Sequence, residues 1–498
     1  MEIGHETKNL TGRIRESPSA LVNELVLRPQ FEYELQYLLP YYIRIEQVMA
    51  REYARLGVLS EKDMLAIVKL LEEIEQKRSI GADPESNMSD ILFALEQCVQ
   101  SRMSRMHQSS SELWHMDRSR NDVQATAQLM FARDALIRVT EHLLDFTEAL
   151  HFLARNTADL PMPGYTHYQP AQIITAGFYI SAMSEQLGRT IRRLLAVFDD
   201  IDECPLGSGA MAGLELAWDR TCLAQQLGFS RPGRHALSGV ASKEWMLHIA
   251  AELSTLGVAL SRFATDFISW GSSGYHFIDL PDSLSGVSSA MPQKKNFPIL
   301  ERIRGKTAHI SAYYTDFVMI QRNTPYTNLV ETAKEGGRHF QDLIDATCHT
   351  AALFTTVIRQ LNFKDERLLG ICTQEFFGGF SLANLLALRA NIPYRTAQVL
   401  AGRYIVAMLN DKKLPQEAPA PLLQEICSEA GYSIDIGESE LRIAFSIDHS
   451  LWGKCTSGSV RPSEVLSLLD EQVKECFSHK ERLQANKRRI GRKSGLYE

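Results

Sequence analysis

The stretch MLHIAAELSTLGVALSRFATDFISW, residues 246–270, decides the fold class. Its apolar residues recur in alternating steps of three and four, which is the heptad spacing of a helix packed in a bundle. They are Met246, Ile249, Leu253, Leu256, Leu260, Phe263, Phe267 and Trp270. A second stretch, from Ala132 to Leu153, repeats this spacing behind a polar Asn121-Asp122 start that suits an N-cap. Two such helices, each on the order of 35–45 Å long, predict an all-α protein built around a long bundle.

The composition excludes several classes of protein. Of the 498 residues, 45% are hydrophobic and 23% are charged, which is typical of a globular protein. The formal net charge of -7 argues against nucleic acid as a partner, because phosphate binding needs an excess of Lys and Arg. The chain has no run of 18 apolar residues and no apolar segment near its start, which predicts a cytoplasmic protein without a membrane span or export signal. The eight cysteines include no C-x-x-C pair and no zinc-type spacing, so we expect single buried thiols and no metal.

Pro- and Gly-rich turns separate the helical runs and suggest three helical domains. We expect an N-terminal helical domain at residues 1–117, a central long-helix bundle with a catalytic loop at 118–367, and a C-terminal helical domain at 368–498. The basic tail KRRIGRK, residues 487–493, is interpreted as a frayed solvated terminus rather than a nucleic-acid patch, given the acidic chain.

Two polar segments flank the start and end of the second long helix. HMDRSRND, residues 115–122, combines arginines and an amide with the free N–H groups of a helix start, which suits a carboxylate or phosphate receptor. An Arg/Asp cluster that only caps the helix fits this segment equally well. MPGYTHYQ, residues 162–169, follows a Pro-Gly turn and presents a hydroxyl, an imidazole and an amide. His167 is a candidate acid or base, although a lone histidine is more often structural.

Two further segments lie in Gly-rich turns. PLGSGAMAG, residues 205–213, has no preceding strand and lacks the G-x-G-x-x-G register, so we expect close backbone packing or an anion contact rather than a nucleotide. SSAMPQKKN, residues 288–296, follows a loop with several glycines that lets the serines close over a substrate. Its serines, lysines and asparagine offer an activated hydroxyl with cationic support, whereas the pattern by itself favours a solvated Ser/Lys-rich loop.

Together with residues 260–283 and 297–306, these segments resemble the argininosuccinate lyase branch of the fumarase/aspartase superfamily, in the same order and at the same spacing. The resemblance is close from about His115 to Lys334 and weak at both ends. It implies a homotetramer whose central helices form a twenty-helix core, with each active site built from three subunits and no cofactor. It also implies elimination of a nitrogen leaving group from a succinyl unit, which releases fumarate.

The resemblance assigns a part in this reaction to five residues. Ser288 matches the catalytic base, and Lys294 and Asn296 match the residues that stabilise the aci-carboxylate dianion formed when the proton leaves. A serine hydroxyl is too weak a base unaided, so it would act as an alkoxide poised by Lys294 and backbone N–H groups. His167 and its carboxylate partner Glu301 match the pair linked to protonation of the departing nitrogen.

The resemblance also implies a set of substrate-binding residues. Arg120, Asn121, Thr166 and Ser289 match the family's holders of the succinyl carboxylates, where a planar arginine suits a carboxylate. Met291, Asn296, Tyr326 and Lys334 complete the expected substrate-binding set.

The chain departs from the family on the side that binds the amine. The family reads YNKDLQEDK where this chain reads YTNLVETAK, residues 326–334, and only the tyrosine and the final lysine are kept. Lys243 stands where the family has Arg, which keeps the charge and loses the planar fork. Met116-Asp117 replaces Thr-Gly, Val287 replaces Gly, and Phe297 replaces Pro.

The sequence therefore predicts a fumarate-releasing carbon-nitrogen lyase whose amine need not be arginine, such as an aminopolycarboxylate or another N-succinyl amine. A non-catalytic, crystallin-like relative is an alternative, against which the intact Ser288, Lys294, His167 and Glu301 count. Adenylosuccinate lyase or fumarase chemistry on the same scaffold is a second alternative, and a helical scaffold for protein partners is a third. The sequence leaves open the amine and the preferred direction of reaction.

Overall fold

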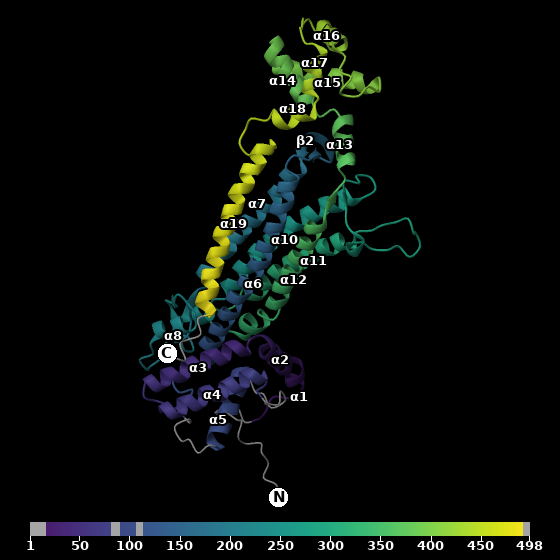
Figure 1. Ribbon diagram of the computed structural model, residues 1–498. Helices are drawn as coiled ribbons and strands as arrows, with labels where there is room; N and C mark the ends of the chain where they lie inside the picture. The colour runs from purple at the N-terminus through teal and green to yellow at the C-terminus, as the bar shows by residue number, and fades with distance from the viewer. Residues whose placement is uncertain (1–15, 81–89, 106–112, 492–498) are drawn as a thin grey trace.

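The computed structural model describes residues 16–80, 90–105 and 113–491. A long helical bundle forms its middle, with helices of the N-terminal region at one end and a small helical group at the other (Figure 1). The bundle contains α6 (Arg120–Asn156), α7 (Ala176–Asp200), α10 (Glu244–Gly271), α11 (Pro298–Gln321) and α12 (Phe340–Gln360). α10 packs against α11 and α7, and α6 packs against α7 and α12. None of the helices in the described ranges is long and apolar enough to cross a membrane.

The two helices expected from heptad spacing are both present. α10 spans the stretch 246–270, and its heptad residues are buried except for Phe263, which is partly exposed. α6 starts at Arg120, and its N-cap is Ser119 rather than Asn121-Asp122, because the Ser119 hydroxyl accepts a hydrogen bond from the Asn121 N–H at 3.2 Å. The 37 residues of α6 extend about 55 Å at 1.5 Å per residue, so its two ends lie at opposite ends of the bundle.

The N-terminal region forms a helical layer against one end of the bundle. It contains α1 (Ala20–Val22), the π-helical turn η2 (Asn23–Leu27), α2 (Arg28–Tyr37), α3 (Leu39–Arg55), α4 (Glu61–Lys77) and α5 (Ile91–Arg105). Its buried residues, such as Tyr42 and Ile67, belong to the same hydrophobic core as those of the bundle.

The C-terminal region has a small core of its own. It follows α13 (Asp365–Gln374) and contains α14 (Gly379–Ala390), α15 (Tyr394–Asn410), α16 (Ala420–Glu429), α17 (Glu438–Ala444) and α18 (Ile447–Trp452). Leu386, Leu400, Tyr404 and Leu423 are buried together there.

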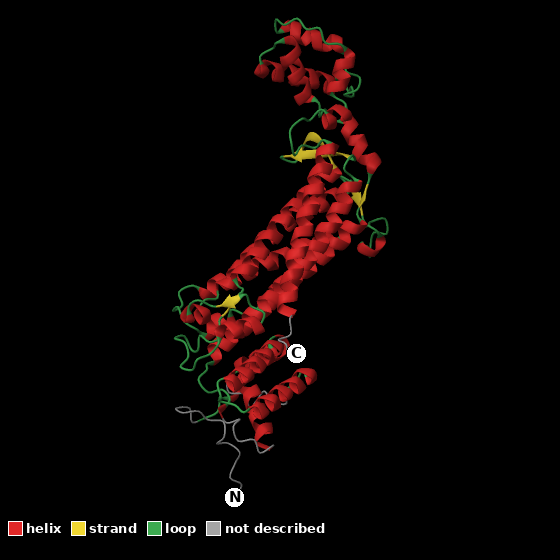
Figure 2. Cartoon of the chain, turned by 60° about the vertical axis from the view of Figure 1, so that its left-hand side comes forward, coloured by secondary structure: helices red, strands yellow, loops and turns green. Residues whose placement is uncertain are grey.

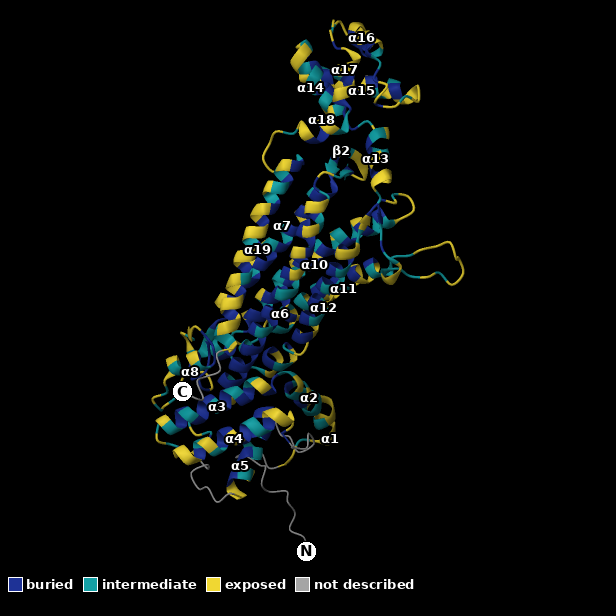
Figure 3. Ribbon diagram, viewed as in Figure 1, coloured by how far each residue is buried: buried dark blue, intermediate teal, exposed yellow. Residues whose placement is uncertain are grey.

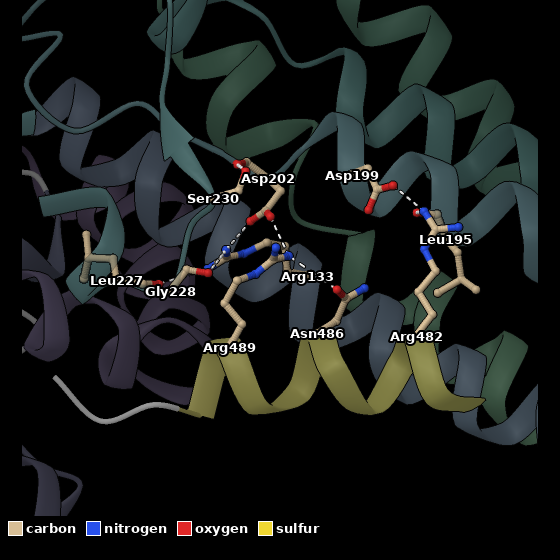
Figure 4. A network of polar contacts seen from close by, with 10 residues as sticks. All are labelled: Arg133, Leu195, Asp199, Asp202, Leu227, Gly228, Ser230, Arg482, Asn486 and Arg489. Carbon is tan, nitrogen blue, oxygen red and sulfur yellow. Dashed lines mark hydrogen bonds and ion pairs between the residues drawn. The ribbon is translucent and has the colours of Figure 1, made fainter. Parts of the chain in front are cut away.

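The last helix differs from the expected C-terminal domain. α19 (Pro462–Gly491) returns along the bundle and packs against α7 and α6. In Figure 4, Arg489 of α19 meets Asp202 at 2.5 Å, and Asp202 also accepts a hydrogen bond from the buried Arg133 at 2.8 Å. The interpretation of the basic tail as frayed is therefore wrong for residues 487–491, while 492–493 lie outside the described residues. The domain limits expected near residues 117 and 367 stay predictions.

The fold is mostly helical rather than all-α, because short strands form three two-stranded pairs in the described ranges (Figure 2). β1 (Pro161–Thr166) pairs antiparallel with β2 (Gln169–Thr175). β3 (Glu203–Cys204) pairs parallel with β4 (Arg231–Pro232), and β5 (Ile278–Asp279) pairs antiparallel with β6 (Asn362–Phe363). Short helical pieces connect the rest: α8 (Arg220–Gln226), α9 (Ala236–Ala241), η5 (Asp282–Leu284) and η6 (Glu331–Glu335).

The turn in the segment 162–169 lies at His167-Tyr168 and not at the expected Pro163-Gly164. Both His167 and Tyr168 have positive φ, 52° and 61°, which is typical of a two-residue turn between antiparallel strands. Gly164 lies inside β1, where an added Cβ would come within 2.9 Å of the Gln172 carbonyl oxygen. The glycine therefore permits close approach of the strands rather than a turn.

The expectation that all eight cysteines are buried holds for five of them. Cys98 and Cys222 are partly exposed and Cys455 is exposed, and none of the eight forms a disulfide.

Candidate active site

The loop that carries Ser288 and Lys294 is a narrow excursion between α10 and α11. Its base is closed by two backbone hydrogen bonds between Gly286 and Asn296, at 2.8 and 3.2 Å. Within the loop, the Ser288 hydroxyl accepts a hydrogen bond from the Met291 N–H at 3.1 Å, and the Lys294 N–H donates to the Met291 carbonyl at 3.0 Å. The loop projects from the bundle and is largely exposed (Figure 3). Its polar side chains are thus available to a ligand or to another chain.

The two adjacent lysines of this loop have different environments. Lys295 forms ion pairs with Asp279 at 3.1 Å and with Asp282 at 3.2 Å, and Asp279 also binds Lys364. Although partial burial opposes the charge on Lys295, these carboxylates raise the pKa of its ammonium group. Lys294 is exposed, and its ammonium group has no ion pair or hydrogen bond with any described residue. Lys295 thus anchors the loop, whereas Lys294 is free to meet a ligand.

The residues expected to handle the leaving nitrogen lie apart within one chain. His167 and Thr166 are exposed at the tip of the β1–β2 hairpin, and Glu301 is exposed in the first turn of α11. In the part of the chain that the structure describes, neither the His167 ring nor the Glu301 carboxylate has a hydrogen bond or ion pair. The expected pair between His167 and Glu301 is therefore not formed within a single chain.

Asn121 lies in the first turn of α6, at the opposite end of this helix from the β1–β2 hairpin. Its side chain contacts two loops. Its amide nitrogen donates to the Ala210 carbonyl at 3.1 Å, and its amide oxygen accepts from the Asn328 side chain at 3.0 Å. Tyr326 lies two residues before Asn328 and is exposed. The rewritten segment 326–334 therefore directly contacts one of the residues expected to bind the succinyl carboxylates. The sequence did not indicate a role for Asn328, because the segment 326–334 was compared with the family only for the residues that it no longer shares.

Arg120 and Lys334 meet at a shared carboxylate. Asp90 Oδ2 lies 3.4 Å from Arg120 Nη1 and 3.7 Å from Lys334 Nζ, and Lys334 also pairs with Glu34 at 3.3 Å. Burial raises the pKa of the Glu34 carboxyl group, and the nearby Lys334 ammonium partly offsets this. Glu34 and Asp90 come from α2 and from the residue before α5, where the family resemblance is weak, and no signal in the sequence indicated them.

Arg118, unlike Arg120, holds the fold. Its guanidinium is buried and donates hydrogen bonds to both carboxylate oxygens of Glu46, at 2.9 Å for Nη1. Burial opposes ionisation of Glu46, but Arg118 and His115 outweigh it and lower the pKa of this carboxyl group to about 2. The side chain of Arg120 is 46% exposed. Of the two arginines, only Arg120 remains a candidate for substrate binding.

Two aspartates of the same segment are structural as well. Asp117 has a φ of 54°, and its carboxylate accepts a hydrogen bond from the Trp218 indole at 2.9 Å. The buried Asp122 accepts hydrogen bonds from the N–H groups of Gly207 and Gly209, each at 2.9 Å. Burial raises the pKa of Asp122 to about 6, although these bonds favour its charged form. The anion contact expected of residues 205–213 is thus made with a carboxylate of the chain itself.

The expected site residues therefore form three groups in one chain. Thr166 and His167 lie beyond one end of α6, and Arg120, Asn121, Tyr326 and Lys334 lie near its other end. The loop with Ser288, Ser289, Met291, Lys294 and Asn296 projects from the side of the bundle (Figure 1), and Glu301 follows this loop in the first turn of α11. A single chain does not bring these groups together.

Comparison with known proteins identifies related enzymes. A family model described as "Lyase" matches residues 16–311. An argininosuccinate lyase from Halorhodospira halophila is 30% identical over 457 residues, covering 91% of this chain and 95% of that protein. Argininosuccinate lyase 1 from Shouchella clausii is 25% identical over 494 residues, covering 98% of each chain.

Solved structures show the same fold. EDDS lyase in complex with formate superposes with a TM-score of 0.85 at 22% identity, covering 98% of this chain and 96% of that one. A variant of EDDS lyase with bound fumarate gives the same values. A class II fumarase from Schistosoma mansoni has a TM-score of 0.67 at 18% identity, covering 84% and 91%. By the family model and by the extent of the match to its relatives, the chain belongs to the lyase family of the fumarase/aspartase superfamily.

Proposed function

We propose that this protein is a carbon-nitrogen lyase that eliminates an amine from an N-substituted aspartate and releases fumarate. One observation carries the proposal: Lys294, His167 and Glu301 are exposed and have no partner among the described residues, whereas Lys295 and Arg118 beside the same motifs are ion-paired. Polar side chains that make no contact within the fold are available to contact a ligand. Among the residues to which the resemblance assigns a part in the reaction, Lys294, His167 and Glu301 have no partner in the described chain, while the Ser288 hydroxyl accepts a hydrogen bond only from the Met291 N–H of its own loop.

The proposed reaction starts with the Ser288 hydroxyl, as its alkoxide, taking a proton from the carbon beside a carboxylate. The electrons of the broken C–H bond pass into that carboxylate and form an aci-carboxylate dianion, which Lys294 and Asn296 stabilise. These electrons then form the C=C bond of fumarate while the C–N bond breaks. The departing nitrogen takes a proton from the acid linked to His167 and Glu301.

The proposed assembly is a homotetramer in which each active site combines residues of three subunits. The helix length supports this, because about 55 Å of α6 separates Arg120 from the hairpin that carries His167. Two groups this far apart in one chain cannot contact the same small substrate. Their meeting therefore requires different copies of the chain, with Ser288, Ser289 and Met291 brought by another loop.

The amine of the proposed substrate is not arginine but another amine that carries carboxylates. The rewritten segment 326–334 supports this, since Leu329 stands where the family has Asp, and Asn328 stands where the family has Lys and binds Asn121. The similarity to EDDS lyase at a TM-score of 0.85 supports an aminopolycarboxylate as the substrate class.

The test is fumarate release, followed by ultraviolet absorbance, from purified protein given argininosuccinate, EDDS, adenylosuccinate or malate. We expect turnover of EDDS or another N-succinyl amine that exceeds turnover of argininosuccinate. Brisk turnover of argininosuccinate would refute a changed amine, and preference for adenylosuccinate or malate would refute the proposed class. Failure to act on any N-succinyl amine would favour a non-catalytic relative.

A further inference from the structure

A buried lysine lines a cavity at the end of the bundle where Asn121 lies. The cavity, about 340 Å³, lies between the start of α10 and the end of α11, and its walls include Lys243, Tyr326 and Thr327. We propose that this cavity is a binding site for a carboxylate carried by the amine half of the substrate, and that Lys243 pairs with that carboxylate. The inference rests on the proposed function and names the group that selects the amine.

Lys243 has no counter-charge within the described chain. Only 3% of the residue is exposed, and its ammonium group has no hydrogen bond or ion pair with any described residue. The backbone carbonyl of Lys243 accepts a hydrogen bond from Gln321, which ties the start of α10 to the end of α11. Burial without a partner lowers the pKa of the ammonium group to about 8. A buried charge of this kind is costly unless a partner satisfies it, and a bound carboxylate is such a partner.

The other charged side chains at this cavity do not neutralise Lys243. Glu244 and Arg322 also line it, and both are exposed to solvent, where water screens their charges. Their charges cancel, so the cavity has a net charge of +1 from Lys243. This charge favours an anionic occupant over a neutral or cationic one.

The cavity adjoins the residues expected to hold the succinyl unit. Tyr326 and Thr327 line the cavity, and the next residue, Asn328, binds the Asn121 side chain at 3.0 Å. A ligand bound at Asn121 would therefore lie next to the cavity that Lys243 lines. Only one short stretch of loop separates the two. Lys243 stands where the family has Arg, so a change at this position accompanies the rewriting of the segment beside it.

The experiment runs the reaction in the direction of addition, with fumarate and paired amines that differ only in a carboxylate. The pairs are ornithine with putrescine, and 2,3-diaminopropionate with ethylenediamine. We expect the wild-type protein to favour the carboxylated amine in kcat/KM. Lys243→Met should lower kcat/KM for the carboxylated amine by about 10- to 100-fold, the effect of one hydrogen bond to a charged group, and leave the other amine unchanged.

Two further variants serve as controls for this test. Lys243→Arg retains the charge and should restore part of the preference, while Lys62→Met removes an exposed lysine on α4 and should change nothing. A preference that survives in Lys243→Met, equal losses for both members of a pair, or a wild-type protein without any preference would each overturn the inference. A wild-type protein that neither adds any amine to fumarate nor releases fumarate from any N-succinyl amine would overturn the proposed function, and the inference with it.

Discussion

The Nζ atom of Lys295 lies 3.1 Å from Oδ1 of Asp279, and this ion pair fixes the base of the loop that carries Ser288. The preceding Lys294 has no such partner among the described residues. The adjacent residues Lys294 and Lys295 therefore differ in function, and mutating each of them separately can distinguish the two functions.

Lys294→Met should lower kcat/KM by about 100- to 1000-fold, as expected for the loss of one donor to a developing negative charge. Its melting temperature should stay unchanged, because the ammonium group binds nothing in the described chain. Lys295→Met should lose less than about 1 kcal/mol of stability, since its ion pairs are partly exposed, and should retain most activity. Equal losses of activity in the two variants, measured by fumarate absorbance, would show that Lys294 has no special part.

The arginines of the segment 115–122 allow a second matched comparison. Arg118→Met leaves the fully buried Glu46 without its main partner and should cost about 3–5 kcal/mol in the free energy of unfolding. Arg120→Met removes a half-exposed side chain and should change stability by no more than about 0.5 kcal/mol, yet lower kcat/KM. Urea unfolding and fumarate release measure the two effects. The assignment is wrong if Arg120→Met is fully active.

The unpaired charge of Lys243 predicts a dependence of stability on pH. Because its pKa falls from 10.5 to about 8 on folding, the folded chain binds fewer protons than the unfolded chain between these values, and stability rises with pH there. Glu244 and Arg322 are the other charged groups at the cavity. Lys243→Met should be more stable than the wild type at pH 7, by about 1–4 kcal/mol. This difference should shrink between pH 8 and pH 10.5 in denaturant titrations, and a constant difference would contradict the account.

Mixing of inactive variants tests whether sites are shared between chains. Arg120→Ala and His167→Ala each remove a residue from an opposite end of α6. If different subunits supply these residues, unfolding and refolding the two variants together should produce some sites with neither change and recover part of the activity. Mixed oligomers that stay inactive would mean that both residues act from the same chain.

The heptad spacing in residues 246–270 was enough to predict α10, because burial in a bundle repeats regularly along the helix. The β1–β2 hairpin was missed, since Pro163 and Gly164 look like a turn, and only pairing with β2 reveals that Gly164 is needed inside a strand. The return of α19 onto α7 was missed for a related reason. Its apolar face shows that the helix packs, but not on which partner.

The candidate site residues, such as Ser288 and Lys294, were named from their own chemistry and motif, and their parts in the reaction stay predictions. The sequence could not predict that Arg118 and Lys295 are the residues of their motifs that stabilise the fold. Their partners, Glu46 and Asp279, lie far away in the sequence or in another turn. The Asn328 contact with Asn121 and the Lys243 cavity likewise depend on neighbours that only the folded chain brings together.

In the proposed reaction, Ser288 removes a proton from a succinyl carbon as fumarate is released. The most direct test of this step compares fumarate formation from EDDS by the wild-type protein and by Ser288→Ala, with the melting temperature and oligomeric state of both recorded. We predict steady release by the wild type and a rate about 100- to 10,000-fold lower in a folded Ser288→Ala protein. Equal rates in the two proteins would contradict the account.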